Sequence, residues 1–513
     1  MPPKAAPTWA YAVLGVLAAA FGVAVGTLAA TYIGLQFAPL DVVASSVIDL
    51  PPAQVKEFFT STFGTSSKTV VVILVAVVVI AISAWAGARS RTRPMFGVQV
   101  MLVAGVVGAV AALLRPVDAL LAPLPALIAG VVAAGALWLL LRWSVRDVVV
   151  DADGSGTQPA VSTLDRRGFI LGAGGVVVVG GLALAGARWL TDRTSAVAAR
   201  VATMLPSPAE PLAPLPASVQ VPGNTPFVTP NADFYRIDTA LIVPQVDPAD
   251  WSLTFDGRVQ QPFTITYADL IAMPMVERDI TIMCVSNPIG GEYISTARWL
   301  GTPLMPLLER AGIQAGADQL LSTSIDGWTC STPLDGLAEA EPLLAIGMNG
   351  EPLPIEHGFP VRMIVPGLYG FISATKWVTQ IKATTYAAES AYWTVRGWAT
   401  DAPVLTGSRI DIPKGEVPAG PTVLAGVAWA MHGDGISRVE VSIDDGPWQE
   451  AQLADQPTPR TWRQWSLDWQ ASSGLHTVAV RATNGRGEVQ TSEVRDVIPD
   501  GATGYDIRPI RVT

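Results

Sequence analysis

The stretch TIMCVSNPIGGEYISTARWLGTPL, residues 281–304, contains Cys284, one of only two cysteines among 513 residues. A strand-like run ends at Cys284, a glycine pair follows, and a helix-like segment then carries Arg298 and Trp299. The residues alone leave three interpretations of Cys284 open. It is a buried free thiol, half of a disulfide with Cys330, or a metal ligand.

Composition excludes several classes of function around this stretch. The net charge of −10 argues against nucleic acid as a partner, because no basic field attracts phosphates. The three histidines, His357, His432 and His476, lie outside the apolar first part of the chain, which excludes a haem held by paired membrane histidines. The length allows two to four domains.

Five apolar runs in the first 195 residues are long enough to cross a bilayer as helices, which takes about 20 residues. The sequence therefore predicts a multi-span α-helical membrane anchor over residues 1–195. The predicted spans are Trp9–Phe37, Val70–Ala88, Met95–Leu114, Ala119–Leu141 and Gly168–Leu190.

Arginines orient these spans. Arg89, Arg91 and Arg93 fill the loop between the second and third spans, and four more arginines lie between the fourth and fifth. Because positive residues stay on the cytoplasmic side, we expect the N-terminus inside and everything after about residue 191 outside. The predicted location is a bacterial plasma membrane, crossed several times, with lipid as a neighbour and an extracytoplasmic catalytic part.

The segment RRGFI, Arg166–Ile170, resembles a twin-arginine export motif, and a mild apolar run follows it. That route exports proteins that have already folded, often around a cofactor. The alternative is that the two arginines only anchor the topology of the fifth span.

The part after the membrane anchor divides by composition. Residues 196–228 are rich in proline and read as an extended tether. Residues 229–417 mix short strands, turns and helices in an α+β pattern without a glycine-rich phosphate loop, so no dinucleotide fold is expected. Residues 418–513 contain evenly spaced strands and predict an immunoglobulin-like β-sandwich. Its tryptophans form a carbohydrate surface, or more simply fill its core and a contact with the preceding domain.

Four segments, taken in order, resemble the sulfite oxidase family of molybdopterin enzymes. CVSN lies eleven residues before STARW, as the family's cysteine loop precedes its Ser-Thr-Ala-Arg-Trp segment. The others resemble the family's first strand, its pterin-binding block and the segment that leaves that block: DFYRIDT at 233–239, MNGEPLPIEHGFPVRMIVPGLYGFISATKWVTQI at 348–381 and YWTVRGW at 392–398. The resemblance covers about 280 residues and includes the C-terminal immunoglobulin-like domain, but not the membrane part.

The resemblance implies a molybdenum–molybdopterin cofactor with Cys284 as the metal ligand. Molybdenum favours soft ligands, and a thiolate is the softest that a protein offers. A Cys284–Cys330 disulfide would consume this ligand.

The resemblance also assigns residues to the pterin and its phosphate. His357, Arg362 and Lys376 fall in the pterin-binding block, where Arg grips phosphate with parallel donors and Lys adds a point charge. Asn231 and Arg236 are further candidate pterin contacts.

Some of these residues have simpler alternatives. His357 is otherwise a capping or surface histidine, and Arg362 otherwise pairs with Glu356. Arg236 and Arg298 are, with Cys284, the candidate catalytic residues. The alternative for Arg298 is a structural ion pair.

The pattern departs from the family in two places. No arginine lies between Cys284 and Arg298, and Thr329-Cys330-Ser331 stands where the family has its active-site tyrosine. Both changes remove groups that hold an anionic substrate.

We therefore expect two-electron oxygen-atom transfer, with sulfite oxidation as the default activity. Reduction of an S-oxide of the methionine sulfoxide type is the first alternative, and a metal-free membrane scaffold is the second. The expected partners are a small sulfur-containing substrate, a quinone or electron-transfer protein, and a second copy of the chain.

Overall fold

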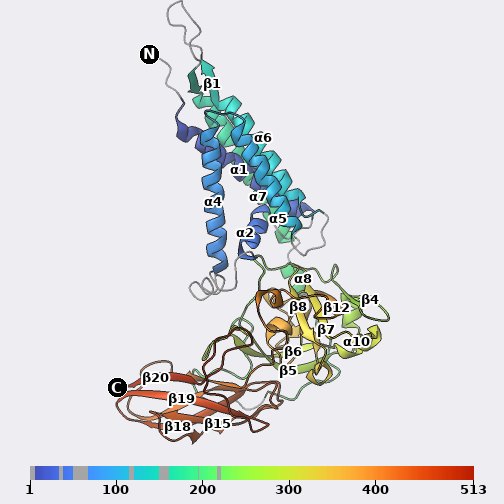
Figure 1. Cartoon of the computed structure of the whole chain (residues 1–513), viewed down its shortest axis with the longest axis vertical. Coiled ribbons are helices and arrows are strands. Elements are labelled where there is room, and N and C mark those ends of the chain that lie inside the picture. Colours follow the sequence, from blue (N-terminus) through green and yellow to red (C-terminus); the bar gives the residue numbers. More distant parts are fainter. Residues whose placement is uncertain are drawn as a thin grey trace, which may run out of the picture. The chain divides into compact units, whose positions relative to one another are not determined.

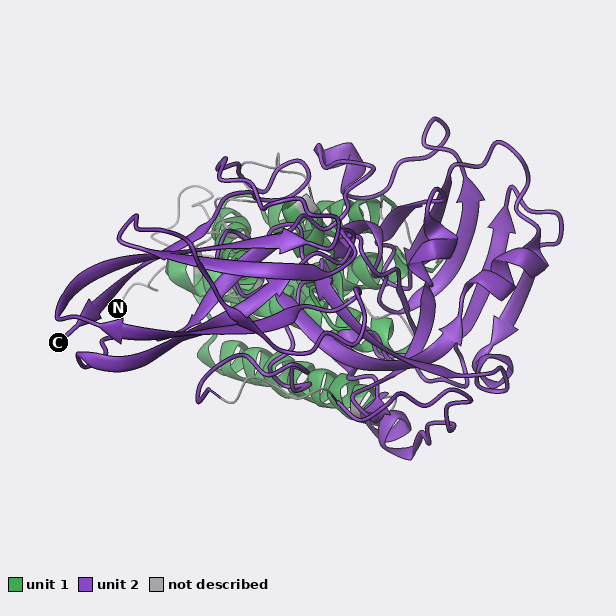
Figure 2. Cartoon of the chain, turned by 90° about the horizontal axis from the view of Figure 1, so that it is seen from below, with its two compact units in different colours: residues 1–195, 240–243 green, residues 196–239, 244–513 purple. Residues whose placement is uncertain are grey.

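The computed structural model describes residues 6–33, 38–49, 67–114, 121–148, 161–193, 196–215 and 221–513. It separates into two compact units (Figure 2). The first is Met1–Ser195 with Ala240–Val243, and the second is Ala196–Thr239 with Pro244–Thr513.

The first unit is helical (Figure 1). Among its described residues, five helices are long and apolar enough to cross a membrane by length and composition. They correspond to the five predicted runs: α1 (Thr8–Tyr32), α4 (Ser67–Arg89), α5 (Phe96–Leu113), α6 (Leu124–Ser144) and α7 (Arg166–Arg193). Two further features were not expected from the sequence: the short helix α2 (Pro39–Asp49), and a two-stranded ribbon of β1 (Val145–Val148) and β2 (Val161–Leu164) before α7.

Small residues let these helices pack closely. A Cβ atom added to Gly15 in α1 would lie 2.9 Å from the Cα of Gly87 in α4. A Cβ on Gly105 in α5 would lie 2.8 Å from the Cα of Gly130 in α6. Glycine is therefore required at these crossings, a device typical of helices that associate in lipid.

The second unit contains two five-stranded sheets before its C-terminal part. One has the order β10-β9-β6-β5, with β11 also paired to β9, and the other has the order β4-β3-β12-β7-β8. Only β12 and β3 pair in parallel among these described strands. The strands of the first sheet are β5 (Val276–Met283), β6 (Ile294–Pro303), β9 (Leu343–Met348), β10 (Glu351–Pro352) and β11 (Arg362–Ile364). Those of the second are β3 (Ser252–Gly257), β4 (Phe263–Thr266), β7 (Gln319–Ser324), β8 (Thr329–Pro333) and β12 (Val378–Thr384).

Short helices lie between, before and after these strands, so the arrangement is α+β. They are α8 (Ala196–Ala202), α9 (Tyr267–Ile271), α10 (Met305–Ala311), α11 (Leu337–Ala340), and the 3-10 turns η2 (Ile355–His357), η3 (Gly370–Ile372) and η4 (Thr394–Arg396).

The expected helix after Cys284 is wrong. The segment with Arg298 and Trp299 is strand β6, which pairs with β5 on one side and β9 on the other. Trp299 is fully buried, and its ring nitrogen donates to the carbonyl of Ile280 at 3.1 Å. Pairing on both edges and burial on both faces outweigh the local helix signal, because sheet contacts come from distant segments.

Residues 407–512 form two four-stranded antiparallel sheets that share one core. Their orders are β13-β14-β18-β17 and β16-β15-β19-β20. The core takes Leu424 and Trp465 from one sheet and Val439 and Val480 from the other, which makes this part a β-sandwich. The strands are β13 (Gly407–Ile412), β14 (Gly420–Trp429), β15 (Ile436–Ile443), β16 (Gln449–Glu450), β17 (Gln452–Leu453), β18 (Arg463–Ala471), β19 (Gly474–Asn484) and β20 (Asp506–Val512).

Tryptophans join the sandwich to the α+β part. Trp429 and Trp462 are buried in a cluster that also contains Met283 and Tyr369. Trp465 and Trp469 lie in the sandwich core. The prediction that tryptophans fill the core and a contact with the preceding domain is confirmed for these four residues.

Candidate active site

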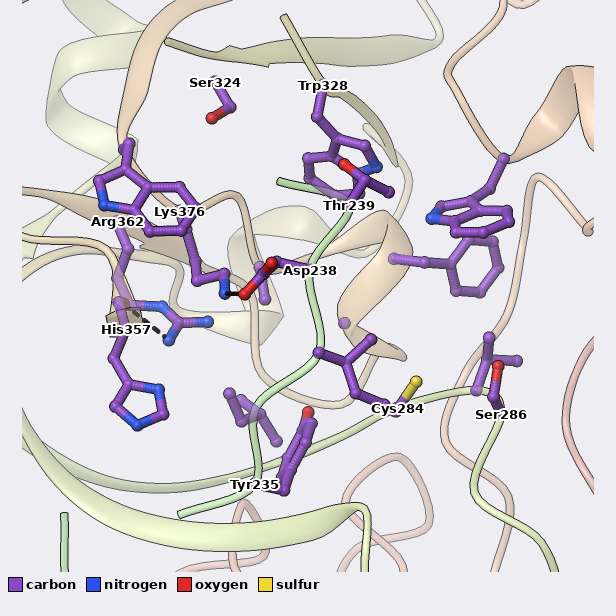
Figure 3. A pocket seen from close by; sticks show the side chains of 18 of the residues that line it. Tyr235, Asp238, Thr239, Cys284, Ser286, Ser324, Trp328, His357, Arg362 and Lys376 are labelled. Carbon is purple, nitrogen blue, oxygen red and sulfur yellow. Dashed lines mark hydrogen bonds and ion pairs between the residues drawn. The ribbon is translucent and has the colours of Figure 1, made fainter. Parts of the chain in front are cut away.

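Loops at the ends of both five-stranded sheets enclose a cavity of about 130 Å³ (Figure 3). Cys284 lines it directly after β5, and Arg362 lines it from the start of β11. His357 at the end of η2 and Lys376 before β12 complete the set of predicted residues that meet here. Four residues that are up to 92 positions apart in the chain are thus brought together by the fold.

The backbone around Cys284 is fixed by hydrogen bonds. Its amide donates to the carbonyl of Tyr293 at 2.9 Å, and its carbonyl accepts from the amide of Asn287 at 3.1 Å. Cys284 and Cys330 are both free, so the alternative of a disulfide is wrong. Burial raises the pKa of the Cys284 thiol, so a nearby positive centre such as a metal ion is needed to hold it as a thiolate.

Arg362 is a buried cation whose charge is poorly compensated. Its side chain packs over the Trp299 ring at 5.1 Å, and Nη1 donates to the carbonyl of His357 at 3.1 Å. Its Nε is buried and has no hydrogen-bond partner among the described residues. Burial lowers the pKa of Arg362 to about 10. The alternative of an ion pair between Arg362 and Glu356 is wrong, because the guanidinium bonds to the carbonyl of His357 instead.

His357 and Lys376 lie beside this guanidinium. Burial, followed by the charges of Arg362 and Lys376, lowers the pKa of His357 to about 3, so the imidazole is neutral at pH 7. His357 is only 3% exposed, which rules out the surface alternative. Lys376 donates to Asp238 at 2.8 Å and to the carbonyl of Glu356 at 3.1 Å, and burial lowers its pKa to about 8.

Gly358 permits this close packing. Its φ is +111°, and a Cβ atom there would lie 3.1 Å from the Cβ of Arg362 and 3.2 Å from the Cα of Lys376. A side chain would therefore be strained and would press on both cations.

Three predicted residues do not line the cavity. Arg298 forms a two-fold ion pair with Asp279, at 2.9 and 2.8 Å, as its structural alternative proposed. Arg236 donates to Asp238 at 2.9 Å and keeps 43% of its side chain exposed. Asn231 donates to the carbonyl of Met348 at 3.3 Å and accepts from Asn349 at 2.8 Å.

Several residues that line the cavity were missed from the sequence. Tyr235 and Asp238 come from the segment that precedes β3. Both belong to the motif DFYRIDT, so their membership of that motif could have predicted them as site residues. Burial raises the pKa of the Tyr235 phenol, so it stays protonated and can donate a hydrogen bond. Four aromatic residues that were not singled out also line the cavity: Trp328, Phe371, Trp393 and Trp398. Phe371, Trp393 and Trp398 lie within the quoted motifs, which was the signal available for them.

Two family models match this part of the chain. The oxidoreductase molybdopterin binding domain covers residues 240–393, and the Mo-co oxidoreductase dimerisation domain covers residues 406–498. A Bacillus subtilis protein, uncharacterized oxidoreductase YuiH, is 35% identical over 138 residues, which are 27% of this chain and 67% of that protein. The chain belongs to the sulfite oxidase family.

Relatives in this family are similar over the same region. Mitochondrial sulfite oxidase of Rattus norvegicus is 30% identical over 290 residues, 47% of this chain and 53% of the relative. The chain therefore spans about half the length of the first curated relatives that it matches. The fold is also that of the sulfane dehydrogenase SoxCD of Paracoccus pantotrophus, with a TM-score of 0.50 and 24% identity over 56% of this chain and 82% of that one.

Members of the sulfite oxidase family are molybdopterin oxidoreductases, and the cofactor of this chain is molybdenum–molybdopterin. The cavity fits this group. Cys284 offers a thiol for the metal, and Arg362 offers a buried guanidinium with an unpartnered Nε for an anion such as the pterin phosphate. A metal-free scaffold would have no bound anion to compensate this buried charge.

Proposed function

We propose that this member of the family is a membrane-anchored oxidoreductase whose catalytic unit lies outside the cytoplasm. The five candidate spans support the anchoring. Arg89, Arg91 and Arg93 follow α4, and Arg166 and Arg167 begin α7. Two spans, α5 and α6, separate these two groups of arginines, so both groups lie on the same side of the membrane. This is the cytoplasmic side when positive residues stay inside. The chain after α7 then lies outside.

The position of Arg166 and Arg167 supports a role in orientation or export. Both lie in the first turn of α7, where the helix dipole disfavours cations. Asp165 supplies the local stabilisation, because its side chain accepts from the amides of Arg167 and Gly168 at 3.1 and 3.2 Å. The arginines therefore do not serve the stability of the helix, and we retain the twin-arginine export signal as a proposal.

The bound cofactor would supply two-electron oxygen-atom transfer between Mo(VI) and Mo(IV). We propose Cys284 as the metal ligand, and Arg362, His357 and Lys376 as the residues that hold the pterin and its phosphate. Asn231 and Arg236 remain candidates for outer contacts with the pterin. The protein's own contribution is to bind, orient and desolvate the substrate beside Cys284.

The division of charge inside the cavity favours a neutral S-oxide as the substrate. Arg362, Lys376 and His357 lie together on one side, and Cys284 lies with Ser286 on another (Figure 3). Lys376 is paired with Asp238, and His357 is neutral. Arg362 is therefore the cation left for the phosphate, and a dianion beside Cys284 would have to compete with the phosphate for it. This separation is the observation that carries the substrate proposal.

Apolar side chains adjoin the loop of Cys284. Val285, the next residue, belongs to the same cluster as Phe371, Trp393 and Trp398. The rings of Phe371 and Trp398 lie 5.7 Å apart. Such a surface suits the alkyl groups of a sulfoxide, and the Tyr235 phenol can donate a hydrogen bond to its oxygen.

Reduction of a sulfoxide takes up two electrons and two protons and releases a thioether and water. The electrons come from a quinone or an electron-transfer protein, which we propose as the redox partner. The match of residues 406–498 to a dimerisation domain supports a homodimer. Their immunoglobulin-like classification remains a prediction.

Sulfite oxidation is the second candidate, since the curated relatives are named sulfite oxidases. Arg236 is the observation in its favour. Its guanidinium is 43% exposed beside Asp238, which itself lines the cavity, so a modest side-chain movement would bring a cation toward an anionic substrate.

The test uses the full chain, purified with molybdenum. Reduction of a dialkyl sulfoxide with a reduced dye is compared with oxidation of sulfite by a ferricyanide acceptor. We expect kcat/KM for the sulfoxide to exceed that for sulfite at least about ten-fold, which corresponds to about 1.4 kcal/mol. Cys284→Ser is the inactive control. A larger kcat/KM for sulfite would overturn the S-oxide proposal and return the assignment to sulfite oxidation.

A further inference from the structure

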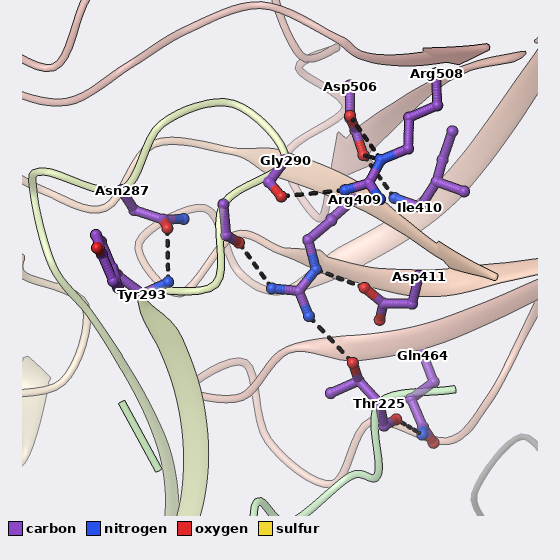
Figure 4. Close-up of polar contacts among 11 residues, drawn as sticks. Thr225, Asn287, Gly290, Tyr293, Arg409, Ile410, Asp411, Gln464, Asp506 and Arg508 are labelled. Carbon is purple, nitrogen blue, oxygen red and sulfur yellow. Dashed lines mark hydrogen bonds and ion pairs between the residues drawn. The ribbon is translucent and has the colours of Figure 1, made fainter. Parts of the chain in front are cut away.

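Two arginines of the C-terminal sandwich donate hydrogen bonds to the far end of the loop that carries Cys284 (Figure 4). Arg409 in β13 donates from Nη1 to the carbonyl of Gly291 at 2.8 Å. Arg508 in β20 donates from Nη2 to the carbonyl of Gly290 at 3.1 Å. The loop itself, residues 284–293, has no cation of its own.

Both arginines are held in place by carboxylates of their own strands. Arg409 is 6% exposed, and its Nε donates to Asp411 at 2.6 Å. The Nε of Arg508 donates to Asp506 at 3.1 Å, and Asp506 also accepts from the backbone amide of Ile410 at 2.8 Å. The paired carboxylates fix the orientation of each guanidinium, so the donors reach the loop from a rigid support.

Arg409 also ties this loop to the segment that leads into the α+β part. Its Nη2 donates to the hydroxyl of Thr225 at 3.1 Å, and Gln464 donates to the carbonyl of the same residue at 2.6 Å. One guanidinium therefore bonds to three separate segments of the chain.

The backbone between these two hydrogen bonds and Cys284 is tightly constrained. Gly290 has φ +69°, and a Cβ there would lie 2.7 Å from Asp506 Oδ1. Asn287 bridges the two ends, since its amide donates to the carbonyl of Cys284 at 3.1 Å and its side-chain oxygen accepts from the amide of Tyr293 at 2.7 Å. The amide of Gly291 closes the turn on the carbonyl of Pro288 at 2.9 Å.

We propose that Arg409 and Arg508 are positioning residues for the metal ligand, so that the sandwich forms part of the active site's support. They hold the carbonyls of Gly290 and Gly291, the turn transmits this constraint through Asn287, and the direction of the Cys284 side chain follows. Neither guanidinium lines the cavity, which separates this role from substrate binding. The proposal rests on the assignment of Cys284 as ligand in the proposed function.

Arg508→Gln is the main variant, because Arg508 keeps 37% of its side chain exposed and we expect its loss to destabilise the fold less than the loss of buried Arg409. Arg409→Lys is the second variant, which keeps the charge but replaces the three separate nitrogens that bond to Asp411, Gly291 and Thr225 with one compact ammonium. Arg511→Gln is the matched control. It lies on the same strand, is 60% exposed and pairs with Glu416 instead of the loop.

Two measurements on the full chain do not depend on turnover. In cofactor-free protein, we expect amide hydrogen exchange of residues 285–293 to rise about ten-fold in Arg508→Gln and in Arg409→Lys, and alkylation of Cys284 by iodoacetamide to change at least about three-fold. Buried Cys330 serves as the internal reference thiol. In molybdenum-loaded protein, we expect the thiolate-to-metal absorption to shift and kcat to fall, with KM little changed.

Loop exchange and Cys284 alkylation that match the Arg511→Gln control in both variants would overturn the proposal, whatever their effect on the melting temperature. Failure of the ligand assignment has a different signature. In that case Cys284→Ser keeps normal turnover and absorption, while the loop exchange of the arginine variants still rises.

Discussion

Replacing Arg362 by Met should have opposite effects on the empty and the loaded protein. Burial lowers the pKa of Arg362 from 12.5 to about 10, which corresponds to a penalty of about 3 kcal/mol on the charged form. Because the folded pKa lies below the unfolded one, this penalty destabilises the fold at every pH below about 10. Met keeps a similar length without the charge. It loses the hydrogen bond to the His357 carbonyl, at a cost of about 1–2 kcal/mol, so the cofactor-free variant should be more stable than the native chain by about 1–2 kcal/mol.

The loaded protein should respond in the other direction. Two charge-assisted hydrogen bonds from one guanidinium to a phosphate contribute about 3–6 kcal/mol. Their loss should weaken cofactor retention by about 10²- to 10⁴-fold.

Tryptophan fluorescence during denaturation of cofactor-free protein measures the first effect, and the molybdenum-to-protein ratio after dilution measures the second. Arg511→Met, an exposed residue, is the control that should change neither. A cofactor-free Arg362→Met protein that is much less stable than the native chain, together with full molybdenum occupancy, would refute the reasoning. Arg362 would then be a structural residue.

Three further changes test other parts of the structure. Cys284→Ser should fold with an unchanged unfolding transition and lose turnover. Normal turnover would contradict the assignment of Cys284 as the metal ligand. His357→Gln should reduce acid sensitivity in the cofactor-free protein. The pKa of about 3 in the native protein lies below the ordinary 6.5, so the unfolded chain takes up the proton first as the pH falls. The free energy of unfolding of the native protein therefore falls by about 2 kcal/mol between pH 7 and pH 5 because of this residue. Equal pH slopes of the unfolding free energy in the variant and the native chain, measured by denaturant titration, would contradict the assignment. Arg166→Lys combined with Arg167→Lys should leave the catalytic unit protected from protease added to whole cells, and unchanged cleavage would make the pair simple topology anchors.

Signals that are local in the chain were sufficient for part of this picture. The five apolar runs match five helices because length and hydropathy are properties of one continuous segment. The ordered motifs were sufficient to place Cys284, His357, Arg362 and Lys376 in one cavity, since each motif is short and carries its own chemistry.

Tertiary structure decided what depends on distant partners. β6 is a strand because β5 and β9 flank it, and Arg298 lies outside the cavity because Asp279 on β5 pairs with it across the sheet. Arg409 and Arg508 reach the cysteine loop from 118 and 218 positions away. The sequence by itself determined which chemical groups are available and which segments are apolar. Only folding decided which charges are neutralised by a neighbour and which stay uncompensated in the cavity, because the strength of a charge depends on burial and on partners that no local pattern records.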